Sequence, residues 1–198
     1  MVRIFYYFWS YFRQFQPPAV RILHGIVLVL VLIQMVSSNL IRFDAAGQVV
    51  GGPAFYLGTW THIATGLLLV PIGMAFVVLE IVRHDVRYFF PYLFGEFSQL
   101  KADIDDLKSR RLPEAKPGSL AAIVQGLGLG ALGLTLAAGL IWFLLWQMGS
   151  GWAEAAKSLH AGLTGLVQAY VVGHGGLGLL HIFIWNRSLR SKQAGPLL

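Results

Sequence analysis

The sequence predicts an all-α integral membrane protein, built as a bundle of four transmembrane helices. Apolar residues make up 56% of the 198 positions, and charged residues only 12%. The mean hydropathy of +0.65 is higher than an ordinary soluble domain shows. Four stretches are long enough and apolar enough to cross a hydrocarbon core about 30 Å thick. We therefore expect a single domain over residues 1–198 that contacts membrane lipid.

The predicted spans correspond to stretches of sequence that lack charged residues or nearly lack polar ones. No charged residue occurs from Ile22 to Ile41, from Ala45 to Leu79, or from Ser158 to Asn186. The third stretch carries only Gln125 and Gln147 as strongly polar groups. We expect helices at about residues 19–41, 57–82, 120–148 and 158–186, with a loop over residues 83–118.

The basic residues predict the orientation of these helices. All but two of the 15 Lys and Arg residues fall in the N-terminal tail, the loop at 83–118 or the C-terminal tail. Because basic residues stay cytoplasmic, both termini and this loop are predicted to be inside. Only Arg42 and Lys157 remain on the periplasmic side. The net charge of +6 follows from this topology and requires no nucleic-acid partner.

Aromatic residues crowd the N-terminus, where no cleavable signal is expected. Phe5, Phe8, Phe12 and Phe15 follow helical spacing before Pro17 and Pro18 turn the chain. This pattern predicts a helix lying in the membrane interface. The alternative is a docking surface for a partner subunit.

Two histidines in the last span indicate the chemistry. His160 and His174 are fourteen residues apart. At ~100° per residue, the rotation about the helix axis from one to the other is within about 40° of four full turns. Both imidazoles therefore face the same way, about 21 Å apart along the helix. Imidazole is a common axial ligand of haem iron, and a polar ring in hydrocarbon requires a reason to be there. The alternative is that each histidine only forms a hydrogen bond to a neighbouring helix.

The expected depth of each histidine in the membrane indicates which histidines can share one iron. His62, near the periplasmic start of the second span, matches His160, so the two can share one iron. His24, near the cytoplasmic start of the first span, can pair with His174 or with His181, which is closer to its depth. The two candidates differ by only about 20° in direction, so geometry leaves the choice open. His84 is interpreted as an interfacial residue at a helix end.

The absence of cysteine limits the cofactor. No c-type haem, thiolate-held iron–sulfur cluster or disulfide can form, so any haem is b-type and held by coordination and packing. The glycines at 126, 128, 130 and 133 lie in an apolar run with no Lys-Ser/Thr after them, which excludes a phosphate-binding loop.

Three motifs resemble the bacterial cytochrome b561-type family, which includes superoxide oxidase and the gamma subunits of formate dehydrogenase and related hydrogenases. They are Arg21-Ile-Leu-His24, Thr61-His62 followed by Gly66, and Lys157-Ser-Leu-His160 with Gly173-His174 and His181-Ile-Phe-Ile-Trp185. The resemblance implies two b haems. It places His62 and His160 on the periplasmic iron and His24 and His174 on the cytoplasmic one, and so favours His174 over His181.

The resemblance leaves three functions to compare. The first is a subunit of a larger oxidoreductase in the bacterial inner membrane, which moves electrons between a periplasmic redox protein and the quinone pool. The second is a stand-alone superoxide:ubiquinone oxidoreductase, and the third is a structural membrane anchor. Arg42 and Lys157 are balanced by Asp44 and Glu154 on the periplasmic side, so anion steering is weak and the first function is favoured.

The quinone contacts are less specific. The cytoplasmic loop resembles the formate dehydrogenase gamma type, but Lys116-Pro-Gly-Ser119 stands where that type has an Asn-Gly-Gln-Lys-like run. The candidates for quinone or haem-propionate contact are Arg21, Gln125 and His181. No catalytic residue is assigned.

Overall fold

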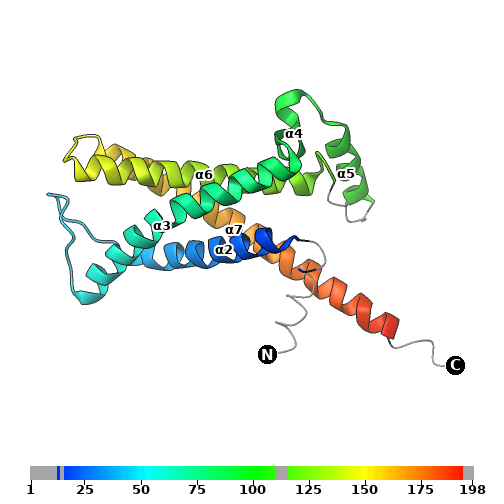
Figure 1. Cartoon of the computed structure of the whole chain (residues 1–198), viewed down its shortest axis with the longest axis horizontal. Helices are drawn as coiled ribbons and strands as arrows, with labels where there is room; N and C mark the ends of the chain where they lie inside the picture. Colours follow the sequence, from blue (N-terminus) through cyan, green and yellow to red (C-terminus); the bar gives the residue numbers. More distant parts are fainter. Residues whose placement is uncertain (1–12, 14–15, 110–115, 194–198) are drawn as a thin grey trace.

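The computed structural model describes residue 13 and residues 16–109 and 116–193. The four phenylalanines of the predicted interfacial helix lie outside the described residues, and that helix stays a prediction. In the described parts of the chain every regular element is a helix, apart from one isolated antiparallel bridge between Phe43 and Val49. The helices are α2 (Pro18–Ser37), η1 (Ser38–Leu40), α3 (Pro53–His84), α4 (Val86–Phe89), η2 (Pro91–Phe94), α5 (Ser98–Lys108), α6 (Leu120–Gln147) and α7 (Ala153–Gln193) (Figure 1).

The predicted all-α class is confirmed, with four helices long and apolar enough to span a membrane. Pro18 and Pro53 occupy the first position of α2 and α3, where a missing N–H has no consequence for helical hydrogen bonding. Two helices are longer than the sequence indicates. α3 begins at Pro53 rather than at residue 57, and α7 extends from Ala153 to Gln193 rather than from 158 to 186.

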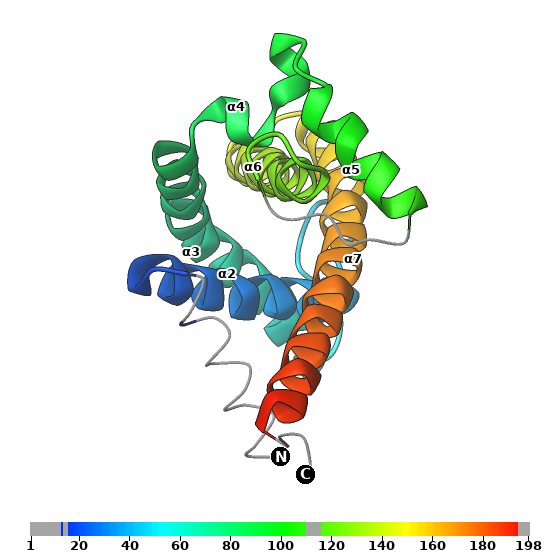
Figure 2. The ribbon, with the colours of Figure 1, turned by 90° about the vertical axis from the view of Figure 1, so that its right-hand side faces the viewer.

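The four long helices pack as two pairs. α2 lies along α3 and α6 along α7, and α3 joins the pairs by packing on α6 (Figure 2). An apolar core lies at the centre of the bundle, formed by Val27, Leu30, Val31, Leu69, Leu132 and Leu136. Phe76, Val167 and Val171 pack against it. These residues occur midway along their helices, so the core separates the two ends of the bundle.

We call the end that carries the connections at 41–52 and 148–152 the hairpin end (Figure 1, left). Trp146 fastens the first connection to α6, because its Nε1 donates to the Gly47 carbonyl at 2.9 Å. Phe43 packs edge-on against Trp142 and Trp146, at ring centroid distances of 5.8 and 5.6 Å. The hairpin end is therefore covered by an aromatic cluster.

The opposite end, which carries α4, η2 and α5, is the cap end. The predicted loop at 83–118 is largely helical here. The Asp103 carboxylate is only 1% exposed and accepts a hydrogen bond from the Leu120 amide at 2.7 Å. Ser119 accepts from the Ala122 amide at 3.1 Å. Because the first amides of a helix need acceptors and favour negative charge, Asp103 holds α5 against the start of α6, while Ser119 caps α6 from within its own chain segment.

Candidate functional site

The four histidines singled out in the sequence meet as two pairs of rings. His62 of α3 and His160 of α7 lie near the hairpin end, with ring centroids 6.4 Å apart and planes at 74°. His24 of α2 and His174 of α7 lie nearer the cap end, with centroids 6.3 Å apart and planes at 90°. The apolar core lies between the two pairs.

The spacing of each pair fits one metal ion held between two imidazoles. A metal–imidazole bond is about 2.0 Å long and a ring nitrogen lies about 1.1 Å from its ring centroid, so two opposed ligands place their centroids about 6.2 Å apart. Within the described residues, no group of three or more His, Asp or Glu side chains forms a metal site. A metal at either pair therefore takes its other ligands from another group, as iron does in a porphyrin.

Hydrogen bonds orient both rings of the first pair. The Nδ1 of His160 lies 3.0 Å from the Thr135 carbonyl, which can only accept, so Nδ1 carries the proton. The Nδ1 of His62 lies 3.2 Å from Ser37 Oγ, whose own proton is donated to the Ile33 carbonyl at 2.7 Å. His62 Nδ1 is therefore also a donor. In both rings Nε2 is left with its lone pair, as a metal ligand requires.

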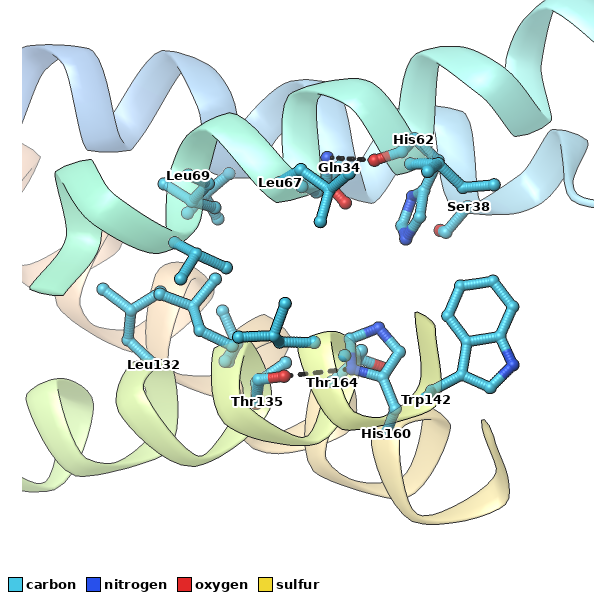
Figure 3. A pocket seen from close by; sticks show the side chains of 18 of the residues that line it. Gln34, Ser38, His62, Leu67, Leu69, Leu132, Thr135, Trp142, His160 and Thr164 are labelled. Atoms are coloured by element: carbon cyan, nitrogen blue, oxygen red, sulfur yellow. Dashed lines mark hydrogen bonds between the residues drawn. The ribbon is translucent and has the colours of Figure 1, made fainter. Parts of the chain in front are cut away.

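A cavity opens between His62 and His160 (Figure 3). It holds about 820 Å³ of empty space, counting the part that opens to the outside. Its walls are mainly apolar, with Leu67, Leu132 and Trp142 among them. Apolar walls beside two imidazole rings suit the face of a flat apolar macrocycle.

Glycine 139 of α6 makes room for one of the rings. A Cβ at this position would lie 2.9 Å from Cε1 of His160 and 3.1 Å from its Nδ1. Carbon atoms do not normally approach so closely, so only glycine lets the His160 ring lie flat against α6. The position of the His160 ring therefore depends on glycine at residue 139.

Two polar side chains near this cavity had no role in the sequence interpretation. Gln34 of α2 donates to the His62 carbonyl at 2.9 Å and to Thr65 Oγ1 at 2.6 Å, which ties α2 to α3 beside the ring. Thr135 Oγ1 is buried and has no hydrogen-bond partner among the described residues. The only sequence signal for both is a polar residue isolated in an apolar span.

The second pair is supported by aromatic packing. Tyr170 stacks on His174, with centroids 4.9 Å apart and planes at 11°, and Phe76 stacks on His24 at 5.8 Å. The Tyr170 ring fits directly over Gly128, where a Cβ would overlap it. Residues from α2, α3, α6 and α7 thus converge on this pair.

The other predicted contact residues lie toward the cap end. Arg21 is partly buried, one turn before His24 on α2. Gln125 is partly buried in the second turn of α6. His181 belongs to α7, seven residues beyond His174, but its side chain lies outside the described part of the structure.

Four membrane-length helices with two partly buried imidazole pairs define a membrane protein suited to hold haem by coordination. A family model described as prokaryotic cytochrome b561 matches residues 16–191, and the chain belongs to this family. It is accordingly a multi-pass bacterial membrane protein, a b-type cytochrome that binds haem and takes part in electron transfer. Searches of the curated proteins and of the solved structures found no significant match.

Proposed function

We propose that the protein holds two b haems and moves electrons across the bacterial inner membrane, between a periplasmic redox protein and the quinone pool. His62 and His160 ligate one haem, and His24 and His174 ligate the other. The observation that carries the proposal is the recurrence of one geometry, two facing imidazoles with centroids 6.3–6.4 Å apart, on both sides of the apolar core.

The chain's own residues keep this chemistry to electron transfer. Bound haem supplies a one-electron couple, and an iron with two imidazole ligands has no open position for a substrate. Ser37 and Thr135 fix the rings of the first pair. His160 and His174 are about 21 Å apart along the axis of α7, and two macrocycles held by these residues would bring their edges much closer than that.

The distribution of basic residues supports an orientation with the hairpin end in the periplasm. The haem at His62 and His160 is then the outer haem, next to the partner protein. The haem at His24 and His174 is the inner haem, next to the quinone. Arg21, Gln125 and His181 are the cap-end groups that we propose for quinone or haem-propionate contact. Membership of a larger complex explains the nearly neutral hairpin end, where Lys157 is paired with Glu154 at 3.3 Å.

The proposal can be tested by measuring the haem content and the redox reactions of the purified protein. A pyridine haemochrome assay is expected to give two b haems per chain, and one haem or none would refute the two-haem arrangement. Added quinol, or a reduced partner protein isolated with the chain, should reduce both haems. Rapid reduction by superoxide alone, with catalytic quinone turnover and no partner, would replace this function with that of a stand-alone superoxide:ubiquinone oxidoreductase. Haem-free protein in an intact complex would indicate a structural anchor.

A further inference from the structure

A carboxyl group is buried at the cap end of α3, among apolar helices. Glu80 is only 9% exposed. It follows His62 by eighteen residues, five full turns at ~100° per residue, so it projects from the ligand-bearing face of α3. Phe76 lies one turn earlier on the same face and stacks on His24. Glu80 is therefore about 6 Å along the helix from the level of the inner ring pair.

Two neighbours on α3 contact this carboxylate. Arg83 Nη1 lies 3.1 Å from Oε1, and His84 Nε2 lies 3.9 Å from Oε2. Burying an ionisable group at the end of a membrane helix is costly, and such groups mark proton or ion routes more often than they add stability. Arg83 balances the charge of Glu80, and the neutral His84 ring offers one nitrogen that donates and one that accepts a hydrogen bond, as a proton relay requires.

His84 connects Glu80 to a polar cavity at the cap end. The cavity is lined by His84, Tyr88, Arg87, Glu96 and Gln99, among others. It offers about 290 Å³ to the centres of water molecules, far more than the ~10–15 Å³ that one ordered water needs. α3 ends at His84, and Asp85 after it has a φ of 69°. The turn brings the Tyr88 ring to 4.5 Å from the His84 ring. His84 thus stands between water and the buried carboxylate.

We propose that His84 and Glu80 form the path by which protons pass between the cytoplasmic water in this cavity and the quinone at the inner haem. The inference rests on the proposed function, because it assigns the proton route for that same quinone. When one quinol is oxidised, its two hydroxyl groups become carbonyl groups. Two electrons pass one at a time to two ferric irons, which become ferrous, and two protons leave through Glu80 and His84 to water. Quinone reduction is the same process in reverse.

Asp85, directly after His84, also lines this cavity, and several other groups around the path are held by partners. Arg87 is paired with Glu96 at 3.2 Å, and Asp103 is bound to Gln99 and the start of α6. Burial, and after it the charge of Glu80, raises the pKa of Tyr88, so that the phenol stays protonated at neutral pH. α6, which packs on α3 and α4, carries no charged side chain, and α2 contributes Arg21 at this end.

The test is a single turnover of the haem-loaded protein with decylubiquinol or menadiol, followed in a stopped-flow instrument with a pH indicator. In Glu80→Gln, haem reduction and proton release should both slow by about 100-fold, the lower range for loss of a group that transfers protons. Glu80→Asp should recover part of the rate, and His84→Gln should also be slow. Glu96→Gln is the matched control, because it removes a carboxylate that lines the same cavity and is paired with Arg87. Its rate should equal that of the wild type.

A second measurement does not depend on turnover. Reduction of the inner haem removes one positive charge, which favours a proton on a carboxyl group nearby, so the midpoint potential of that haem should depend on pH. Glu80→Gln should flatten this dependence and leave the potential of the outer haem unchanged. One outcome separates the two proposals. If quinol reduces the wild-type protein, and both Glu80→Gln and His84→Gln have the same rate and pH dependence as the wild type, then the proton path is wrong and the proposed function stands. If neither quinol reduces the wild type, the quinone reaction fails and the proton path fails with it. If Glu80→Gln loses haem, His84→Gln decides between these outcomes.

Discussion

Glycine 139 offers a sharp test of the outer haem site, because its substitution changes the site without touching a ligand. In Gly139→Ala the new Cβ would lie 2.9 Å from Cε1 of His160, where ordinary carbon contacts are about 3.5–4.0 Å. Either the ring or α6 must therefore move by about 0.6 Å or more. The Thr135 carbonyl on one side, and in the proposed site an iron on the other, restrain the ring, so the shift is not free.

The expected loss follows from the bond that this shift breaks. The His160 Nδ1–Thr135 O distance is 3.0 Å, and a displacement of this size takes it to the limit of a hydrogen bond, about 3.5 Å. Removing the partner that orients a ligating imidazole typically weakens metal binding 10–100-fold. That corresponds to about 1.4–2.8 kcal/mol of binding free energy. The outer haem should be partly lost on dilution while the inner haem is retained.

Gly133→Ala is the matched control, on the same helix with nothing within 4 Å of the new Cβ. Helix propensity favours alanine over glycine by about 1 kcal/mol in both variants, so backbone effects alone predict stabilisation of both. The measurements are haem per chain by pyridine haemochrome and the two components of a redox titration. Full retention of both haems in Gly139→Ala, with potentials equal to those of Gly133→Ala, would refute the packing argument.

Two further predictions concern the ligands and their supports. Alanine in place of either member of one ring pair should remove the same haem, so four variants fall into two spectral classes: His62→Ala with His160→Ala, and His24→Ala with His174→Ala. His181→Ala should keep both haems, and loss of a haem there but not in His174→Ala would reverse the ligand assignment. Ser37→Ala should raise the potential of the outer haem alone, because an imidazole without its hydrogen-bond acceptor is a weaker donor to ferric iron. Ser38→Ala is the control, because the Ser38 hydroxyl lines the same cavity but donates to the Met35 carbonyl and not to a ligand ring, and both potentials should stay close to those of the wild type.

The fold could be predicted because its signals are local. A charge-free run long enough to cross a membrane has few alternatives to a helix, since unpaired backbone groups in hydrocarbon are costly. The ring pairs follow from helical periodicity combined with depth. His24 illustrates the limit of this reasoning, because depth left two partners open. In the structure the His174 ring lies 6.3 Å from the His24 ring, while the role of His181 stays a prediction.

What the sequence did not indicate depends on contacts between segments far apart. Asp103, in a segment expected to be a loop, closes on the Leu120 amide seventeen residues later. Gly139 acquires its role only when α7 packs against α6. The length of α7 was underestimated for a different reason. A hydropathy pattern ends at the first charged residue, but Arg187 and the polar residues after it are compatible with helix and carry α7 to Gln193.

The apolar core gives the two proposals a common physical basis. Electrons cross packed hydrocarbon over short distances, but protons need a continuous series of polar groups or water. The core between the ring pairs consists of side chains such as Leu30, Leu69 and Leu132, which offer no such groups. In the proposed two-haem arrangement, an electron that passes from one haem to the other would therefore leave its proton behind. A reaction that binds or releases protons must therefore exchange them with water at the same end of the bundle. At the cap end, Glu80 and His84 lie between the interior of the bundle and the water-accessible cavity.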